Sequence, residues 1–286
     1  MAVTLERPQA AGAAASTSAS GSVSPAGDES SPQYAKRRMY HLFAADGKAL
    51  VVAMDGARGG PAVGLHDSVL AVRRVVEGGA NAILTTPGMA RATAHVLRGR
   101  GLIVGLDSED DSSDFGVEYA IRLGADAVEL KVFPGNPTSS KLGQLRRLAA
   151  RCAEWNMPLL AEPIPISFQD TAAHTIENVA KAARIGAEAG ADLLKVHFVR
   201  PVAEYAERVI QECYLPVLCL GGPAKDDPVD ALRACHDAIA AGARGVVFGR
   251  NIVNNPRPDR MCDALGEIIH GGASAEAAAK RLQTQF

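Results

Sequence analysis

The chain has 286 residues, 47% of them hydrophobic, with 30 basic against 32 acidic side chains. This composition is typical of a soluble globular protein, and the near-neutral charge gives no indication of a nucleic-acid or membrane surface. No apolar run approaches the ~18 residues that span a bilayer. Five cysteines without a Cys-x-x-Cys pair argue against a closed disulfide framework. We therefore expect a cytoplasmic protein with no nucleic-acid or membrane partner.

Residues 1–33 are rich in Ala, Ser and Gly and contain almost no large apolar side chains. Such a segment cannot offset the entropy lost on ordering, so we expect a disordered tail followed by one folded domain over residues 34–286. A transit peptide is the alternative. It is disfavoured by Glu6, Asp28 and Glu29 and by the presence of a single arginine in this segment.

From Tyr40 onward, strand-length apolar runs alternate with amphipathic helical stretches. Gly-Ala pairs, as at Gly79-Ala80 and Gly190-Ala191, are predicted to end helices before the next strand. The eight predicted strands are Ala49–Asp55, Ala82–Pro87, Leu102–Asp107, Ala127–Phe133, Pro158–Pro165, Leu193–Phe198, Pro216–Gly222 and Gly245–Asn251. Eight βα units predict an α/β fold of the (β/α)8 TIM-barrel type. A doubly wound open sheet is the alternative, but the first strand lacks its usual Gly-rich turn.

Successive residues of a barrel strand face alternately inward and outward, so polar residues can be sorted by parity. The sorting places titratable groups on inward positions near the C-terminal ends of strands, where barrel enzymes carry catalytic groups. These candidate catalytic residues are Asp55, Asp107, Lys131, Glu162, Lys195 and His197. The alternative is a structural ion-pair network that fills the barrel mouth.

Lys195 lies inside the short apolar strand Leu193–Phe198, where an unpaired ammonium is costly to bury. Desolvation that lowers its pKa would leave an amine able to attack a carbonyl and form a Schiff base. Lys131 is interpreted as a second cation, a proton shuttle or the partner of Glu129 on the same strand. His197 is either a proton-transfer group or a hydrogen-bonded wall residue.

Glycines at the ends of the seventh and eighth strands indicate a phosphate site. Gly221 and Gly222 follow Leu220, and Gly249 and Arg250 follow Phe248. Backbone N–H groups at glycines can approach an anion, and these two loops form the usual phosphate cradle of this fold. Lys225 and Asn251 are weaker candidates, and plain tight turns are the alternative. We thus expect a phosphorylated small-molecule substrate. No metal is expected, because the histidines form no His-x-His or His-Glu-x-x-His cluster.

Between about Tyr40 and Gly272 the chain resembles the class I aldolases that group archaeal-type fructose-bisphosphate aldolase with the deoxyribose-phosphate aldolase superfamily. The matching segments are Val52-Ala53-Met54-Asp55 with Gly60-Pro61, Gly190 to Lys195, Pro216 to Pro223 and Gly242 to Asn251. The resemblance implies a barrel enzyme that needs no cofactor. In it Lys195 forms the Schiff base, Asp55 assists proton transfer, and Gly222, Gly249 and Arg250 hold phosphate. Relatives often form rings, so a homo-oligomer is expected.

Two positions depart from the family pattern. Gly56 follows the first-strand aspartate where relatives commonly have histidine, and Ile164 stands where archaeal-type enzymes resemble Met-Tyr-Pro with a tyrosine acid/base. Isoleucine cannot transfer protons, so that role would pass to Glu162, His197, Asp107 or a water.

The expected function is that of a metal-independent aldolase acting on a phosphorylated ketose or dihydroxyacetone phosphate. The proton relay is assigned to Glu162 or Asp55. Enzymatic alternatives are a synthase that transfers a three-carbon unit to an amino-aldehyde such as aspartate semialdehyde, and a thiolase-like acyltransferase that uses coenzyme A. Further alternatives are a noncatalytic sugar-phosphate binding barrel and an FMN-binding oxidoreductase.

Overall fold

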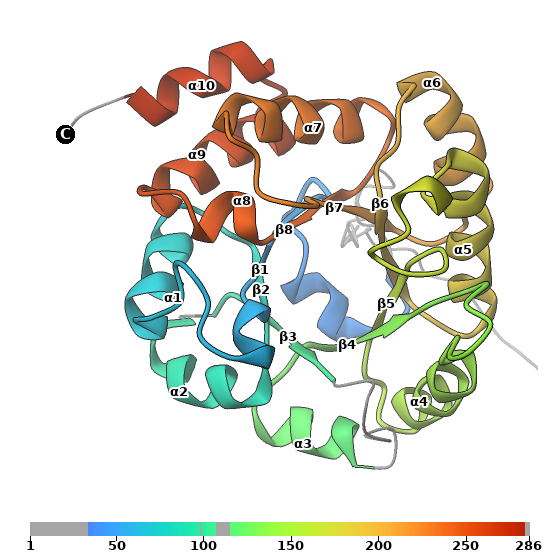
Figure 1. Ribbon diagram of the computed structural model, residues 1–286. Coiled ribbons are helices and arrows are strands. Elements are labelled where there is room, and N and C mark those ends of the chain that lie inside the picture. Colours follow the sequence, from blue (N-terminus) through green and yellow to red (C-terminus); the bar gives the residue numbers. More distant parts are fainter. Residues whose placement is uncertain (1–33, 98, 107–114, 284–286) are drawn as a thin grey trace, which may run out of the picture. The chain divides into compact units, whose positions relative to one another are not determined.

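The computed structural model describes residues 34–97, 99–106 and 115–283. These residues form a closed barrel of eight parallel strands in which β1 pairs with β8, so the predicted TIM barrel is confirmed (Figure 1). The strands are β1 (Ala49–Ala53), β2 (Ala82–Thr85), β3 (Gly101–Gly105), β4 (Ala127–Val132), β5 (Leu159–Pro163), β6 (Leu193–His197), β7 (Val217–Leu220) and β8 (Gly245–Phe248). The predicted tail, residues 1–33, lies outside the described residues.

Helices follow the strands and surround the ring that the strands form (Figure 1). The α-helices are α1 (Ser68–Glu77), α2 (Pro87–Leu97), α3 (Gly116–Arg122), α4 (Leu142–Glu154), α5 (Ile176–Glu188), α6 (Val202–Tyr205), α7 (Pro228–Ala240), α8 (Arg250–Val253), α9 (Pro258–Ile269) and α10 (Ala275–Gln283). Short helical segments are η1 (Arg37–His41), η2 (Gly56–Gly59), η4 (Thr171–Ala173) and η5 (Ala206–Gln211).

Local signals in the sequence set where the helices begin and end. Side chains of Asp67, Thr175 and Asp227 accept hydrogen bonds from the first turns of α1, α5 and α7, as N-cap residues do. Gly190, in one of the Gly-Ala turns, has φ of 102°, and Gly242 has φ of 100°. Such positive φ values favour glycine, which explains why these pairs end helices immediately before a strand.

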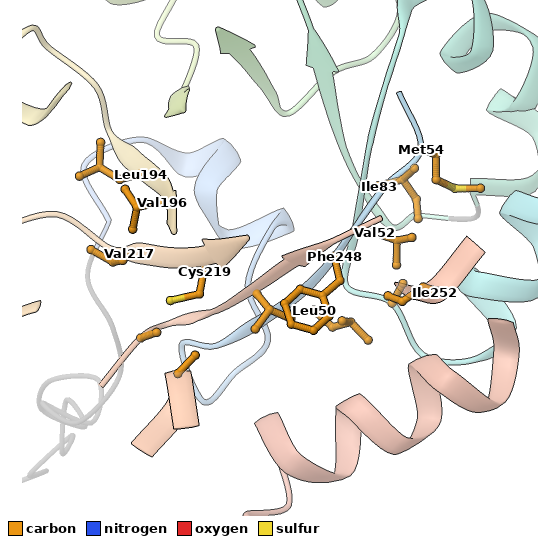
Figure 2. Packing of buried hydrophobic residues seen from close by; sticks show 14 of the residues in the cluster. Leu50, Val52, Met54, Ile83, Leu194, Val196, Val217, Cys219, Phe248 and Ile252 are labelled. Atoms are coloured by element: carbon orange, nitrogen blue, oxygen red, sulfur yellow. The ribbon is translucent and has the colours of Figure 1, made fainter. Parts of the chain in front are cut away.

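The main hydrophobic core lies between the barrel and its helices. Leu50 and Val52 of β1 and Phe248 of β8 point into this layer, where they pack with residues from β6, β7 and α8 (Figure 2). Because the side chains of a strand alternate, the opposite positions of the same strands face the barrel interior. Burial of the outward row holds the inward row at a fixed height in the barrel.

A second, smaller core fills the lower part of the barrel interior. Inward residues of the strands, such as Val51 and Leu193, pack there with Met39, Leu42 and Phe43 from the segment around η1. This segment, blue in Figure 1, lies inside the ring of strands. The filled floor leaves the interior open only toward the C-terminal ends of the strands.

Two further sequence expectations concern cysteines and membrane spans. All five cysteines are buried and free. Within the described part of the chain, no helix combines the length and apolarity required to cross a lipid bilayer.

Candidate active site

A cavity of about 750 Å³ opens at the C-terminal ends of the strands. This is within the size range of small-molecule sites in proteins. Every candidate residue among the described residues lines it: Asp55, Lys131, Glu162, Lys195, His197, Gly221, Gly222, Gly249 and Arg250. Asp107 lies outside the described residues. The candidates therefore surround an open space, and several of them also form ion pairs with one another.

Lys195 is held at the bottom of this cavity by strand register. Leu160 of β5 pairs with Leu193 of β6, so the inward residues two positions further along, Glu162 and Lys195, lie side by side. Lys195 is only 5% exposed, and its Nζ lies 2.9 Å from Oε2 of Glu162. A buried ammonium requires such a partner. Lys195 therefore combines three features: burial, a carboxylate partner and access to the cavity.

Lys131 has a different environment, with three carboxylates around it. Its Nζ lies 2.9 Å from Oδ2 of Asp55, 3.6 Å from Oε1 of Glu129 and 3.9 Å from Oε2 of Glu162. Burial lowers the pKa of Lys131, but the three carboxylates outweigh this effect and raise it well above its usual range. Lys131 is thus held as a cation, which fits the interpretations as a second cation and as the partner of Glu129 better than that as a proton shuttle.

The same cations decide the charges of two carboxyl groups. Burial raises the pKa of Asp55, but Lys131, Lys195 and Arg58 together lower it to about 2. Burial also raises the pKa of Glu162, but the charges of Lys195 and Lys131 lower it below its usual value. Both groups are therefore carboxylates at neutral pH.

Glu129 lies one layer deeper in the barrel. It is fully buried, and it pairs in register with Gly105 of β3 and Leu160 of β5. Burial is the largest effect on this carboxyl and, together with the charge of Glu162, raises its pKa to about 7. The parity argument placed Glu129 on the inward face but assigned it no role beyond a partner for Lys131.

His197 forms part of one wall of the cavity together with a loop. Its ring stacks on His174 at a centroid distance of 4.0 Å, and Phe168 meets the same ring edge-on at 6.2 Å. Burial, and then the neighbouring His174, lower the pKa of His197 to about 4, so it is neutral at physiological pH. Sequence reasoning missed His174 and Phe168, because they lie in the loop between β5 and α5.

The predicted phosphate residues lie in the part of the cavity at β7 and β8, next to His197, which pairs in register with Leu220 of β7. Gly222 has φ of 65°, and a Cβ added to Gly249 would lie 2.8 Å from the carbonyl oxygen of Ala53. Both positions therefore require glycine, and the exposed guanidinium of Arg250 follows at the start of α8. This end of the cavity combines close backbone approach with a cation, which suits an anionic group.

Asn251 connects the two phosphate loops. Its Nδ2 donates to the carbonyl oxygens of Gly221, at 3.0 Å, and Pro223, at 3.2 Å. Its Oδ1 accepts the backbone N–H of Lys225 at 2.9 Å. Asn251, a weaker candidate in the sequence, therefore holds the loop after β7 against α8 instead of contacting the cavity as a ligand.

The structure also places Ile164. Its side chain is fully buried, and its backbone N–H donates to Val132 at 2.9 Å. It is not among the residues that line the cavity. Within the described ranges, no group of three or more His, Cys, Asp or Glu side chains has the arrangement of a metal-ion site.

The amino-acid sequence is similar to those of known proteins. Residues 41–255 match the sequence profile of the DeoC/LacD family aldolases. The chain is 34% identical over 251 residues to the 2-amino-3,7-dideoxy-D-threo-hept-6-ulosonate synthase 1 of Archaeoglobus fulgidus, an alignment covering 84% of this chain and 93% of that protein. It is 35% identical over 163 residues to the 2-amino-4,5-dihydroxy-6-oxo-7-(phosphonooxy)heptanoate synthase of Streptomyces griseus, covering 57% of this chain and 59% of that protein.

Solved structures give a similar result. The crystal structure of an archaeal fructose 1,6-bisphosphate aldolase matches with a TM-score of 0.71 and 26% sequence identity. The match covers 82% of this chain and 98% of that chain. The likeness therefore extends over nearly the whole of the solved barrel, including the strand ends that form the cavity.

Proposed function

We propose that this chain, which belongs to the DeoC/LacD aldolase family, uses Lys195 to form a Schiff base with a phosphorylated ketone and so makes or breaks a carbon–carbon bond. The observation that carries the proposal is the position of Lys195. It is buried at the floor of the cavity, and its Nζ lies 2.9 Å from Glu162. A lysine in this setting has a proton acceptor at hand and a space above it for a carbonyl.

Imine formation can be written with Glu162 as the proton carrier. The ammonium of Lys195 passes a proton to the Glu162 carboxylate, and the free amine attacks the ketone carbon. Proton movement from nitrogen to oxygen gives the carbinolamine. Glu162 then returns its proton to the hydroxyl, which leaves as water, and the nitrogen lone pair forms the iminium. The net change is loss of one water, with Glu162 again a carboxylate.

Carbon–carbon cleavage uses the iminium as an electron sink. Removal of a hydroxyl proton from the substrate forms an aldehyde carbonyl, and the electrons of the broken bond move to nitrogen to give an enamine. We assign this proton to Glu162, because the ion pair with Lys131 makes Asp55 a weak proton acceptor. Asp55 and Lys131 then act as a fixed pair of opposite charges beside the reacting carbon.

A phosphorylated substrate is supported by the part of the cavity at β7 and β8. Gly222, Gly249 and Arg250 lie in the loops after β7 and β8, where barrel enzymes hold phosphate. A substrate with its phosphate there and its ketone at Lys195 would lie along the cavity. Dihydroxyacetone phosphate and ketose phosphates have this form.

A second candidate function is transfer of a three-carbon unit to an amino-aldehyde. Two observations favour it over cleavage of fructose 1,6-bisphosphate. The relatives from Archaeoglobus fulgidus and Streptomyces griseus are named as synthases of amino-heptulosonate and amino-heptanoate products. Ile164, where archaeal-type aldolases have a tyrosine acid/base, is buried away from the cavity.

The test is covalent trapping. We would incubate the protein with dihydroxyacetone phosphate, reduce with borohydride and locate the added mass by peptide mass spectrometry. The expected adduct is on Lys195 and is absent in Lys195→Met. In the control Lys131→Met, Lys195 should still be labelled, although more slowly. Labelling of another lysine, or of none across a panel of ketose phosphates, would contradict the proposal.

Product analysis then separates the two candidate reactions. Fructose 1,6-bisphosphate is offered alone, and aspartate semialdehyde is offered together with dihydroxyacetone phosphate. Release of triose phosphates from the first supports a cleaving aldolase. Consumption of the amino-aldehyde with formation of a seven-carbon phosphate supports the synthase.

A further inference from the structure

Glu129 is a buried titratable group that the proposed mechanism does not use. Its side chain is fully buried beneath Lys131 and Glu162, and its carboxyl group contacts that of Glu162 closely enough for a hydrogen bond. A Cβ added to Gly105 on the neighbouring strand would lie 2.6 Å from Nη2 of Arg58 and 3.0 Å from Oε2 of Glu129, so the ends of both side chains lie against this glycine. The carboxyl groups of Glu129 and Glu162 both lie within 4 Å of Nζ of Lys131, at 3.6 and 3.9 Å.

As a carboxylate, Glu129 would lack hydrogen-bond donors. Neither of its oxygens has a donor within hydrogen-bond geometry among the described residues. Nζ of Lys131 lies 3.6 Å from Oε1 of Glu129 and is bound more closely by Asp55, at 2.9 Å. A fully buried anion without a donor is costly, and a second carboxylate against it adds repulsion.

One proton removes both costs. If Glu129 is a carboxylic acid, its O–H donates to Glu162, and the contact between two acceptors becomes a hydrogen bond. Glu162 carries the negative charge of this pair, because it is Glu162 that Lys195 contacts at 2.9 Å. Each of the two close ion pairs then joins one cation to one anion at 2.9 Å: Lys131 to Asp55, and Lys195 to Glu162.

We propose that Glu129 is a positioning residue that remains protonated and donates a hydrogen bond to Glu162, which keeps Glu162 oriented and able to exchange a proton with Lys195. The effect on imine formation rests on the proposed Schiff-base function, whereas the protonation of Glu129 does not. Loss of the Glu129 proton places a second anion beside Glu162. Two anions retain the ammonium proton of Lys195 more strongly, so imine formation slows.

The variants Glu129→Gln and Glu129→Met test this arrangement. Glutamine keeps a neutral donor of the same shape, whereas methionine has similar length and no donor. We would measure the rate of adduct formation on Lys195 with dihydroxyacetone phosphate and borohydride across a range of pH. Below neutral pH, Glu129→Gln should form the adduct at the wild-type rate. At higher pH, ionisation of Glu129 should slow adduct formation in the wild type but not in this variant. Glu129→Met should be slower by roughly ten- to a hundredfold.

A second measurement needs no substrate and no catalysis. Infrared spectroscopy of the wild-type protein should show the carbonyl band of a protonated carboxyl group at neutral pH, and the band should be absent in Glu129→Gln. Absence of this band from the wild type would overturn the proposal. The proposal would also be overturned if Glu129→Gln formed the adduct as slowly as Glu129→Met and kept the pH profile of the wild type. Glu129 would then act as an anion. A band that is present in a protein forming no adduct on Lys195 would instead refute the proposed function alone.

Discussion

The protonation of Glu129 has a consequence for the stability of the fold that can be measured without any substrate. Burial raises the pKa of this carboxyl group from 4.5 to about 7 in the native protein. Between these two pH values the native state binds a proton that the unfolded chain has lost. The free energy of unfolding therefore falls as pH rises from 4.5 to about 7, and the loss is complete above that value.

In Glu129→Gln the side chain no longer binds or releases a proton, so its contribution to the pH dependence of stability is removed. The rise of the pKa from 4.5 to about 7 corresponds to roughly 3 kcal/mol, since a tenfold change in proton affinity is worth about 1.4 kcal/mol. We expect the stability of Glu129→Gln relative to wild type to increase by up to about 3 kcal/mol between pH 4.5 and pH 7. This is a large part of the ~5–15 kcal/mol that stabilises a typical domain.

The assay is urea unfolding followed by circular dichroism at a series of pH values. Each variant is compared with wild type at the same pH, so that groups common to both proteins cancel. Asp259→Asn, on α9, is the matched control. Because its hydrogen bond with Arg257 holds the pKa of Asp259 below its usual value, this group is ionised in both states above pH 4.5, and its stability difference should not change over the window. A flat difference for Glu129→Gln would refute the reasoning and show that Glu129 is ionised in the native protein.

Three further predictions concern the walls of the cavity. Gly249→Ala places a Cβ 2.8 Å from the carbonyl oxygen of Ala53 and should lower stability by about 1–3 kcal/mol in thermal unfolding and raise the KM for a phosphorylated substrate. Gly266→Ala in α9, outside the cavity lining, meets no atom within 4 Å and should leave the KM unchanged and not lower stability. Asn251→Asp replaces the amide donor that holds the loop after β7, so in steady-state assays KM should rise by roughly tenfold with a smaller change in kcat. The ring of His197, assigned in NMR spectra by its loss in His197→Asn, should titrate with a midpoint near 4, and a midpoint at its ordinary value of 6.5 would contradict the burial argument.

Much of the barrel could be predicted from the sequence because strand alternation is a local property. All eight strands begin within one residue of their predicted starts. The parity rule placed Lys131, Glu162 and Lys195 on one interior surface, where the structure brings them within ion-pair distance. The Gly-Ala turns were also predictable, since a positive φ leaves few choices other than glycine.

The depth of each side chain in the barrel and the paths of the loops could not be predicted in the same way. Parity alone does not predict that Lys131 contacts three carboxylates, or that Glu162 is the ion-pair partner of Lys195. These contacts depend on the register between strands that are separated in the chain. His174 reaches His197 through a loop with no periodic pattern. The segment around Met39, which fills the barrel floor, has too few apolar residues for its place in the core to be visible in the sequence.

The loop after β5 shows how a departure from the family pattern changes the site. Ile164 is buried at the strand end, and Ile166 has φ of 59°, a left-handed conformation that a β-branched residue rarely adopts. From this turn the chain continues to Phe168 and His174, which cover His197. The wall of the cavity at His197 is therefore built from a loop and not from the tip of β5. We expect the aldehyde to bind against this wall, so that differences between relatives in the aldehyde they accept follow this loop, whereas the lysine and the carboxylates below it can stay the same.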